Sequence, residues 1–280
     1  MVLDSLETSH SSKAAPQGSD SWPDRDLSGS DAGPYRLISR FGKRGGADLY
    51  LAVKRRDTSR QTVDIKVVDT ACAPAKALQR FNQERELVGR FEHAQLARVL
   101  DEGTTSTGAP FLAMEHINAV PVTEYARLRS LNPSACIELM LQLCSAVEYL
   151  HSKGFVHRDL RPENVLVTAA GKLKIVDFTC MTPAGVATAH DNHVDRVYTS
   201  PEVYLGGSCA RASDVYSMGV LLHELVTGVR PDSAAAWPTR ALKTTGIPEL
   251  DTVISKAVRT APEDRFRSAA EFAQRLQRLL

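Results

Sequence analysis

The stretch from residue 157 to residue 178 constrains this chain more than any other part of it. It begins His157-Arg158-Asp159-Leu160-Arg161-Pro162-Glu163-Asn164 and ends Asp177-Phe178. The residues between, 165–176, read as two apolar runs on either side of a glycine turn, which predicts a small antiparallel hairpin. Asn164 then lies at the entry of the hairpin and Asp177 at its exit, so their side chains can converge on one metal ion.

The spacing of Asp159, Asn164 and Asp177 suits phosphoryl transfer from a magnesium nucleotide. One acid can orient a hydroxyl nucleophile, while the carboxamide and the second acid hold the metal. This reaction asks little covalent chemistry of a protein; it needs cations between the phosphates, an in-line alcohol and fixed geometry. A single loop Asp or Asn would be an ordinary turn or cap residue. The whole string at this spacing favours the catalytic interpretation.

The same string resembles the catalytic and metal-binding loops of eukaryotic-type protein kinases, and bacterial Ser/Thr kinases most of all. The resemblance extends from about Tyr35 to Leu280. It implies an α+β, bilobal protein-kinase-like fold over residues 34–280. A small antiparallel β N-lobe is expected at about 34–115 and a mainly helical C-lobe at about 118–280.

Composition agrees with such a domain. Of 280 residues, 43% are hydrophobic and 24% charged, enough for one large domain or two lobes. The net charge of +1 gives no sign of a nucleic-acid or anionic-membrane partner. Five cysteines without paired or metal-ligand spacing indicate reduced thiols, and no signal peptide or membrane-length apolar run is seen. We therefore expect a cytoplasmic protein without membrane insertion, preceded by a disordered polar tail at residues 1–33.

In the N-lobe, strand-like patterns are expected at 35–41, 49–53 and 63–68, followed by a helix over about 75–91. The resemblance implies that Lys66 grips the nucleotide phosphates and that Glu84, on the helix, forms an ion pair with it.

The resemblance also implies ATP and Mg²⁺ as cofactors. Met114 would guard the base pocket, and Glu115, His116 and Ile117 would form the hinge between the lobes. The predicted catalytic residues are Asp159, Arg161, Lys66 and Glu84. The predicted nucleotide contacts are Gly42, Lys66, Met114, Glu115, Ile117 and Leu166, and the predicted metal ligands are Asn164 and Asp177.

Three features of the C-terminal part support the resemblance. Ser200-Pro201-Glu202 is similar to the motif that closes the activation segment, and Asp214 stands where the family anchors the catalytic loop. Arg265 would pair with Glu202, since a buried carboxylate suits the planar fork of an arginine.

The nucleotide's surroundings depart from the family pattern. The three glycine-rich-loop positions hold Gly42, Arg44 and Ala47. Arg44 could contact a phosphate as a cation or could occupy the phosphate site. Asp64 replaces the small alanine that usually roofs the adenine, and a carboxylate there is bulky and costly to desolvate.

The catalytic segments depart as well. Arg161 replaces a lysine, which keeps the charge but changes the shape. Thr179 replaces the glycine after Asp177-Phe178, and a β-branched residue disfavours positive φ, so this segment should flip less freely. Asp195 falls at a threonine position that touches Asp159 in the family, and we hypothesise an Arg161–Asp195 ion pair in its place.

Arg158 suggests control by phosphorylation of the activation segment, with Thr182, Thr188 and Thr199 as candidate sites. An ordinary polar loop explains these threonines equally well.

Two functional classes compete. The first is a protein Ser/Thr kinase with autophosphorylation; the second is a pseudokinase, a binding or regulatory module with weak or no transfer. The enzyme is favoured because the chain has all five groups that handle metal, phosphate and nucleophile in the family: Lys66, Glu84, Asp159, Asn164 and Asp177. Asp64 is the main argument against it. Small-molecule phosphotransferases are a third class, which Glu202, Asp214 and Arg265 disfavour. The protein substrate, the activating signal and the oligomeric state stay open, including a homodimer through the kinase domain.

Overall fold

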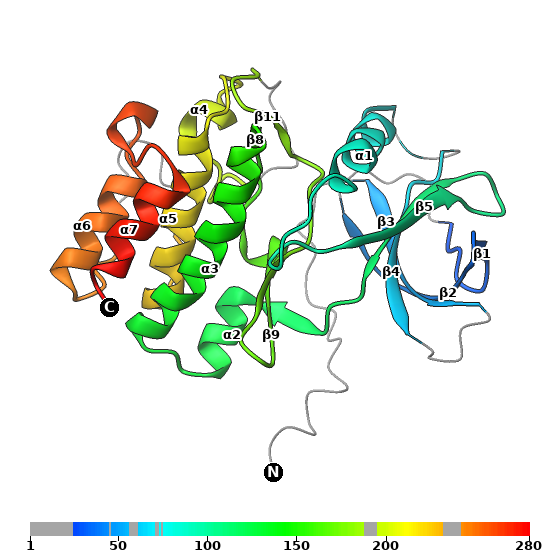
Figure 1. The fold of residues 1–280 in the computed structure, drawn as a ribbon, viewed down its shortest axis with the longest axis horizontal. Coiled ribbons are helices and arrows are strands. Elements are labelled where there is room, and N and C mark those ends of the chain that lie inside the picture. Colours follow the sequence, from blue (N-terminus) through cyan, green and yellow to red (C-terminus); the bar gives the residue numbers. More distant parts are fainter. Residues whose placement is uncertain are drawn as a thin grey trace, which may run out of the picture.

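The chain folds into two adjoining parts, one dominated by a sheet and one by helices (Figure 1). The structure, a computed structural model, describes residues 25–44, 46–55, 61–70, 73, 75–187, 195–231 and 242–280. The predicted α+β, bilobal fold is confirmed.

The first lobe is built on a six-stranded antiparallel sheet with the strand order β1-β2-β3-β4-β6-β5. Alternating exposed and buried residues in β2 are typical of a strand with one solvated face. The strands are β1 (Asp31–Ala32), β2 (Tyr35–Arg44), β3 (Ala47–Lys54), β4 (Thr62–Val67), β5 (Val99–Thr104) and β6 (Pro110–Glu115).

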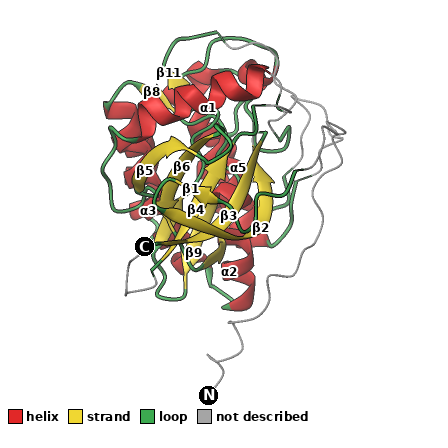
Figure 2. Cartoon of the chain, turned by 90° about the vertical axis from the view of Figure 1, so that its right-hand side faces the viewer, coloured by secondary structure: helices red, strands yellow, loops and turns green. Residues whose placement is uncertain are grey.

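The two faces of this sheet have different partners. One face holds an apolar cluster that includes Tyr50, Ile65 and Phe111. The other face meets helix α1 (Ala75–Val88), whose Phe81 packs with Leu112 and Met114. Figure 2 shows α1 lying across the sheet. Since β4 alternates, Lys66 shares the α1 face with its ladder partner Leu112.

Two predicted boundaries are wrong. The tail was expected to run to residue 33, but β1 lies inside that range, and Leu27 is buried with its amide donating to the Tyr50 hydroxyl. Residues 1–24 lie outside the described part of the chain. The helix expected to reach residue 91 ends at Val88, because Gly89 follows and is a poor helix former.

The second lobe is mainly helical around one large apolar core. Asn132 caps the longest helix, its side chain accepting from the Ala135 amide, and a proline follows at the first helical position. The helices are α2 (Val122–Leu128), α3 (Pro133–Ser152), α4 (Pro201–Tyr204), α5 (Arg211–Thr227), α6 (Pro248–Ala257) and α7 (Ala269–Gln277), with 3₁₀ turns at Pro162–Asn164 and Pro262–Asp264.

The predicted hairpin is present. β9 (Val165–Thr168) pairs antiparallel with β10 (Leu173–Ile175), and β7 (Ala119–Pro121) pairs with the other edge of β9. A second small ladder joins β8 (Phe155–Val156) to β11 (Thr182–Pro183). These short ladders fix the segments on either side of the hairpin, which carry the predicted catalytic and metal-binding residues.

The predicted Arg265–Glu202 pair is confirmed. The guanidinium of Arg265 is bidentate on the carboxylate, with nitrogen–oxygen distances of 2.9 and 2.8 Å. It also donates to the carbonyls of Arg259, Ala212 and Thr260. The pair joins α4 to the turn before α7 and to the first turn of α5, so it holds the end of the activation segment in place.

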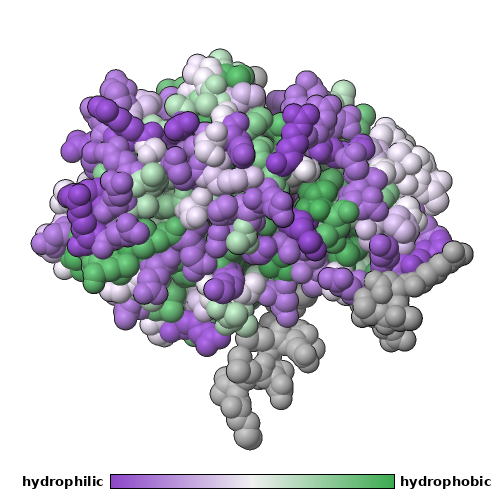
Figure 3. Space-filling view, in the orientation of Figure 1, coloured by the Kyte–Doolittle hydropathy of each residue, from purple (hydrophilic) through white to green (hydrophobic). Residues whose placement is uncertain are grey.

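Charged and polar side chains cover most of the molecular face in Figure 3, with separate apolar areas between them. None of the described helices has the length and apolar character needed to cross a membrane. Cys136, Cys144, Cys180 and Cys209 are free thiols, as predicted; Cys72 lies outside the described residues.

Removing the arginine of the Glu202 pair should cost stability. Arg265→Met leaves the mostly buried carboxylate of Glu202 without its cation, while the hydrogen bond from Ser213 Oγ remains. We therefore expect the free energy of unfolding to fall by about 3–5 kcal/mol in urea titrations. Arg85→Met, in the partly exposed pair with Glu102, is the matched control and should cost about 0–1 kcal/mol. Equal losses for both variants would contradict a structural role for Arg265.

Candidate active site

The lobes enclose a cavity of about 230 Å³ whose lining comes from both of them. Five of the predicted nucleotide contacts line it: Lys66, Met114, Glu115, Ile117 and Leu166. Gly42 does not, because it has no side chain and its backbone pairs with Leu49 in the β2–β3 ladder. Its neighbours Phe41 and Arg44 line the cavity, and the predicted contact between Gly42 and the nucleotide stays a prediction.

Lys66 is the centre of a buried polar network. Its Nζ lies 2.6 Å from Glu84 Oε2 and 3.2 Å from Asp177 Oδ1, which confirms the predicted ion pair with Glu84. Only 3% of the Lys66 side chain is exposed. Burial lowers the pKa of Lys66, but the carboxylates of Asp177 and Glu84 outweigh it, so the pKa is raised and the ammonium stays charged.

The hydroxyl of Thr179 belongs to the same network. It accepts from Lys66 Nζ at 2.6 Å and lies 2.6 Å from Asp177 Oδ1, to which it can donate. The Thr179 amide also donates to Asp177 Oδ1, at 3.1 Å. Thr179 is not among the described residues with positive φ, as its β-branched side chain predicts. The side chain that replaces a glycine therefore fixes the carboxylate of Asp177.

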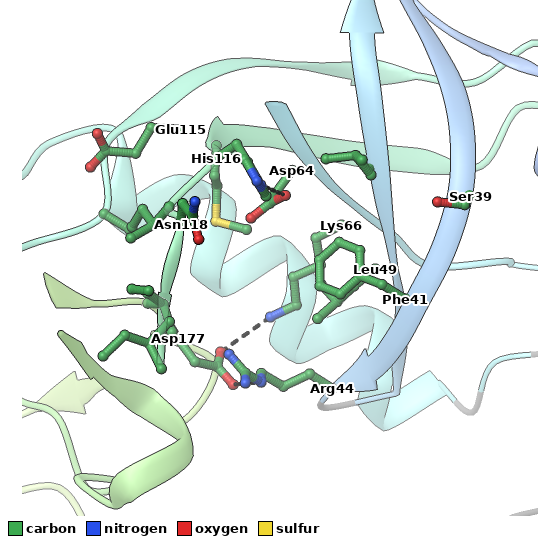
Figure 4. Close-up of a pocket in the computed structure, with 17 residues that line it drawn as sticks. Ser39, Phe41, Arg44, Leu49, Asp64, Lys66, Glu115, His116, Asn118 and Asp177 are labelled. Atoms are coloured by element: carbon green, nitrogen blue, oxygen red, sulfur yellow. Dashed lines mark hydrogen bonds and ion pairs between the residues drawn. The ribbon is translucent and has the colours of Figure 1, made fainter. Parts of the chain in front are cut away.

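Asp177 has a further cationic neighbour. Arg44 extends from the end of β2 toward it (Figure 4), with Nε 3.7 Å from Asp177 Oδ2 and Nη2 donating to the Glu163 carbonyl at 3.1 Å. Burial raises the pKa of Asp177, but Lys66 and Arg44 outweigh it and hold the pKa well below its usual range. Arg44 therefore lies beside the carboxylate that is predicted to hold the metal, and both of its predicted roles, contact with a phosphate and occupation of the phosphate site, stay predictions.

Asp159 and Asn164 meet at the C-lobe side of the site. Asn164 Nδ2 donates to Asp159 Oδ2 at 2.7 Å and to the Asp159 carbonyl at 2.8 Å. Burial raises the pKa of Asp159, and Arg161, with Nε 3.6 Å from Oδ1, opposes it; the net shift is upward. A carboxylate with a raised pKa is suited to accept a proton.

Asp214 sets the shape of the catalytic loop. It is fully buried, and its carboxylate accepts from the amides of His157 and Arg158 at 2.9 and 2.8 Å and lies 2.8 Å from His151 Nε2. Arg158 has a φ of 71°, an uncommon conformation for a side-chain-bearing residue. The anchoring role predicted for Asp214 is confirmed, and it explains how Asp159 is held beside Asn164.

The site fits a hard cation. Asn164 Oδ1 is buried and accepts no hydrogen bond from the described residues. The described His, Cys, Asp and Glu residues form no cluster of three that could hold a metal alone. Mg²⁺ commonly takes one or two protein oxygens and completes its shell with phosphates and water. Asn164 and Asp177 are the residues that would hold it.

The predicted Arg161–Asp195 ion pair is wrong. Asp195 Oδ2 is 2.5 Å from Arg230 Nη2, while Arg161 Nε lies 3.6 Å from Asp159 and 3.7 Å from Glu163. No pattern in the sequence indicates that Asp195 pairs with Arg230, which lies 35 residues away along the chain.

The candidate phosphorylation sites differ in access. Thr199 is buried and donates to the Asp195 carbonyl at 2.8 Å, so this conformation does not present it. Thr182 is half-buried in β11, and Thr188 lies outside the described residues. Arg158 donates to the Cys180 carbonyl at 3.1 Å, which places its guanidinium beside the activation segment.

Two cavity residues form a pair that sequence reasoning missed. Asp64 Oδ1 and His116 Nδ1 are 2.8 Å apart at the hinge end (Figure 4). The pair follows from the sheet register, because Asp64 pairs with Met114 in the β4–β6 ladder and His116 follows two positions later.

Comparison with known proteins agrees with this geometry. Residues 35–277 match the protein kinase domain family, and the chain belongs to that family. It is 29% identical over 274 residues to the serine/threonine-protein kinase PknB of Mycobacterium tuberculosis, covering 88% of this chain and 42% of the relative. It is 29% identical to Pkn1 of Myxococcus xanthus over 278 residues, covering 90% and 39% of the two chains.

A third relative is the serine/threonine-protein kinase PrkC of Bacillus subtilis, 27% identical over 257 residues, with 86% of this chain and 39% of the relative covered. The chain thus spans about two fifths of the length of the curated relatives it matches.

The Thr179 hydroxyl should stabilise the Lys66 network. Thr179→Val keeps the shape but removes the hydrogen bonds to charged groups, so we expect the free energy of unfolding to fall by about 1.5–3 kcal/mol. Thr179→Ser keeps the hydroxyl and is the control, with a much smaller loss. Urea titrations measure both, and a serine variant as unstable as the valine variant would show that the methyl group matters instead.

The Asp64–His116 contact should make stability depend on pH. The hydrogen bond to Asp64 raises the pKa of His116 above 6.5, against the opposing effect of burial. The stabilisation is therefore complete below the unfolded-state pKa and is lost as pH rises through the raised folded-state pKa. The difference in urea midpoint between the wild type and Asp64→Ala should shrink over that interval. A difference that is constant with pH would contradict the ionic contact.

Proposed function

We propose that this chain is an ATP- and Mg²⁺-dependent protein kinase that transfers the γ-phosphate to Ser or Thr hydroxyls of proteins, including its own. The observation that carries the proposal is a pair of adjoining contacts. Lys66 meets Asp177 in the interlobe cavity, Asn164 meets Asp159, and the two contacts are joined where the Val176 amide donates to the Asn164 carbonyl. Family membership and the names of the relatives support it.

In the proposed reaction, the adenine edge lies against the hinge, where the Ile117 amide makes no backbone hydrogen bond within the described part of the chain. Lys66, held by Glu84, binds the inner phosphates. Asn164 and Asp177 would hold magnesium, which would supply positive charge to the phosphate oxygens.

Asp159 orients the substrate hydroxyl and takes its proton. Asn164 occupies Oδ2 of this carboxylate, which leaves Oδ1 for the hydroxyl. Arg161, next to Oδ1, steadies charge on the transferring group. The pKa of Asp159, raised by burial, favours acceptance of the proton.

A second candidate function is that of a pseudokinase. Two observations favour it: Arg44 lies at the carboxylate that would hold the metal, and Asp64 brings a carboxylate into the base end of the cavity. A thermal-shift titration with Mg-ATP, run beside a radiolabel transfer assay, separates the two. Binding with transfer supports the kinase, and binding without transfer supports the pseudokinase.

Partners and location belong to the same proposal. Protein substrates and a cytoplasmic location with access to ATP are proposed, and no nucleic-acid partner is. A homodimer through the kinase domain stays a prediction. Residues 34–280 are proposed as the kinase domain.

The role of Asp159 can be tested directly. Asp159→Asn keeps the shape and the contact with Asn164 but removes the base, so autophosphorylation should fall by about 10²–10⁴-fold. Circular dichroism should show an unchanged fold. Glu249→Gln, at an exposed position on α6, is the control and should keep full activity. Undiminished incorporation of labelled phosphate by Asp159→Asn would refute the assignment.

A further inference from the structure

The register of the N-lobe sheet places Asp64 over the cavity. In β4, Asp64 and Lys66 are two residues apart and so share one face. Their ladder partners on β3 are Leu51 and Leu49, and both leucines line the cavity. The carboxylate of Asp64 therefore lies in the roof of the cavity, beside the apolar side chains of Leu51 and Leu49.

The other carboxylates that line the cavity are balanced by cations. Asp177 lies beside Lys66 and Arg44. Glu115 Oε1 is 2.5 Å from Lys174 Nζ, and its carboxylate points away from the cavity in Figure 4. Asp64 is left with His116 as its polar partner within the described residues.

The His116 contact holds Asp64 toward the hinge. Both side chains are mostly buried, with 22% of Asp64 and 28% of His116 exposed, so water screens the pair incompletely. The imidazole supplies the hydrogen bond that a carboxylate loses when a base covers it and removes its water.

Resting on the proposed function, we propose that Asp64 and His116 act as one unit that keeps the base slot open to adenine. His116 is a positioning residue: it holds the Asp64 carboxylate toward the hinge, and its imidazole supplies a hydrogen bond to that carboxylate. Without His116, the entering base must desolvate a lone carboxylate. Without Asp64, the cavity has no lone carboxylate at the base end, so the loss of His116 should not weaken binding of the base.

The proposal predicts a specific pattern in a double-mutant cycle. His116→Ala should weaken the binding of adenosine by about tenfold, because the carboxylate is then covered without a partner. Asp64→Ala should bind adenosine at least as tightly as the wild type. The double variant should match Asp64→Ala to within about threefold, so the loss at His116 depends on Asp64.

Adenosine and Mg-ATP are both titrated by calorimetry, because adenosine carries no phosphates. The proposal expects the same fold-change for both ligands. A change confined to Mg-ATP would mean that the pair acts on the phosphates through charge, and it would overturn the assignment to the base slot.

Two further variants sharpen the test. His116→Asn keeps an N–H donor and should recover most of the affinity. His93→Ala removes a histidine that stacks on Tyr149 and does not line the cavity, so it should leave adenosine affinity unchanged. Circular dichroism confirms that each variant is folded.

Failure of this inference differs from failure of the proposed function. If the wild type binds adenosine and Mg-ATP but transfers no phosphate, the kinase proposal is wrong, and the double-mutant cycle still tests the Asp64–His116 pair through binding. A wild type that transfers phosphate, with His116→Ala binding as tightly as the wild type, would overturn the pair alone. A double variant as weak as His116→Ala would also overturn it.

Discussion

The buried ammonium of Lys66 is the interaction on which the geometry of the cleft depends. It comes from the central strand β4, and it contacts Glu84 on α1 and both Asp177 and Thr179 after β10. A buried charge is tolerated only when it is paired and hydrogen-bonded. Displacing α1, or turning residues 177–179 away, would leave the ammonium of Lys66 buried without its partners. The strand β4, the helix α1 and residues 177–179 are therefore held in one arrangement. Thr179 strengthens the constraint because its hydroxyl contacts the cation and its amide contacts Asp177.

A second contact between the lobes is made by the side chain of Arg44. Arg44 links the end of β2 to Asp177 and to the carbonyl of Glu163, a residue 119 positions away. Its charge balances Asp177, while Lys66 is shared with Glu84. The end of β2 is therefore held to the catalytic segment by the guanidinium of Arg44, at a position where the family pattern has a glycine. Together with Lys66, whose effect is larger, Arg44 holds the pKa of Asp177 low despite its burial.

The parts of the site that the sequence predicted are those in which spacing along the chain determines geometry. The hairpin fixes Asn164 and Asp177 at its two ends, and strand alternation puts Lys66 on the face toward Glu84. Sequence reasoning missed the contacts that depend on side-chain reach between distant segments. Arg230 reaching Asp195 is such a contact.

Other misses had local causes. The bound of the N-terminal tail was wrong because one leucine, Leu27, has a tertiary partner in Tyr50 that polar composition does not reveal. Thr179 was considered for its backbone preference alone, because the contacts of its hydroxyl with Lys66 and Asp177 depend on the folded arrangement of the cleft. Asp64 was considered as an isolated carboxylate, because its contact with the hinge residue His116 can be seen only once the β4–β6 register is known.

The departures Asp64, Thr179 and Arg161 share a physical property: each of these side chains lies beside a group of opposite charge or makes a hydrogen bond. Asp64 is matched by His116, Thr179 bonds to Lys66 and Asp177, and Arg161 lies between Asp159 and Glu163. Substitutions that accumulate without constraint in a buried cleft would leave unpaired charges, each destabilising the fold. Stability alone could be met by apolar replacements, which are often as good as a buried ion pair or better. The charged groups of the cleft stand instead in compensated pairs around Asn164 Oδ1, which accepts no hydrogen bond from the described residues, and this arrangement agrees with the proposed binding of a charged ligand.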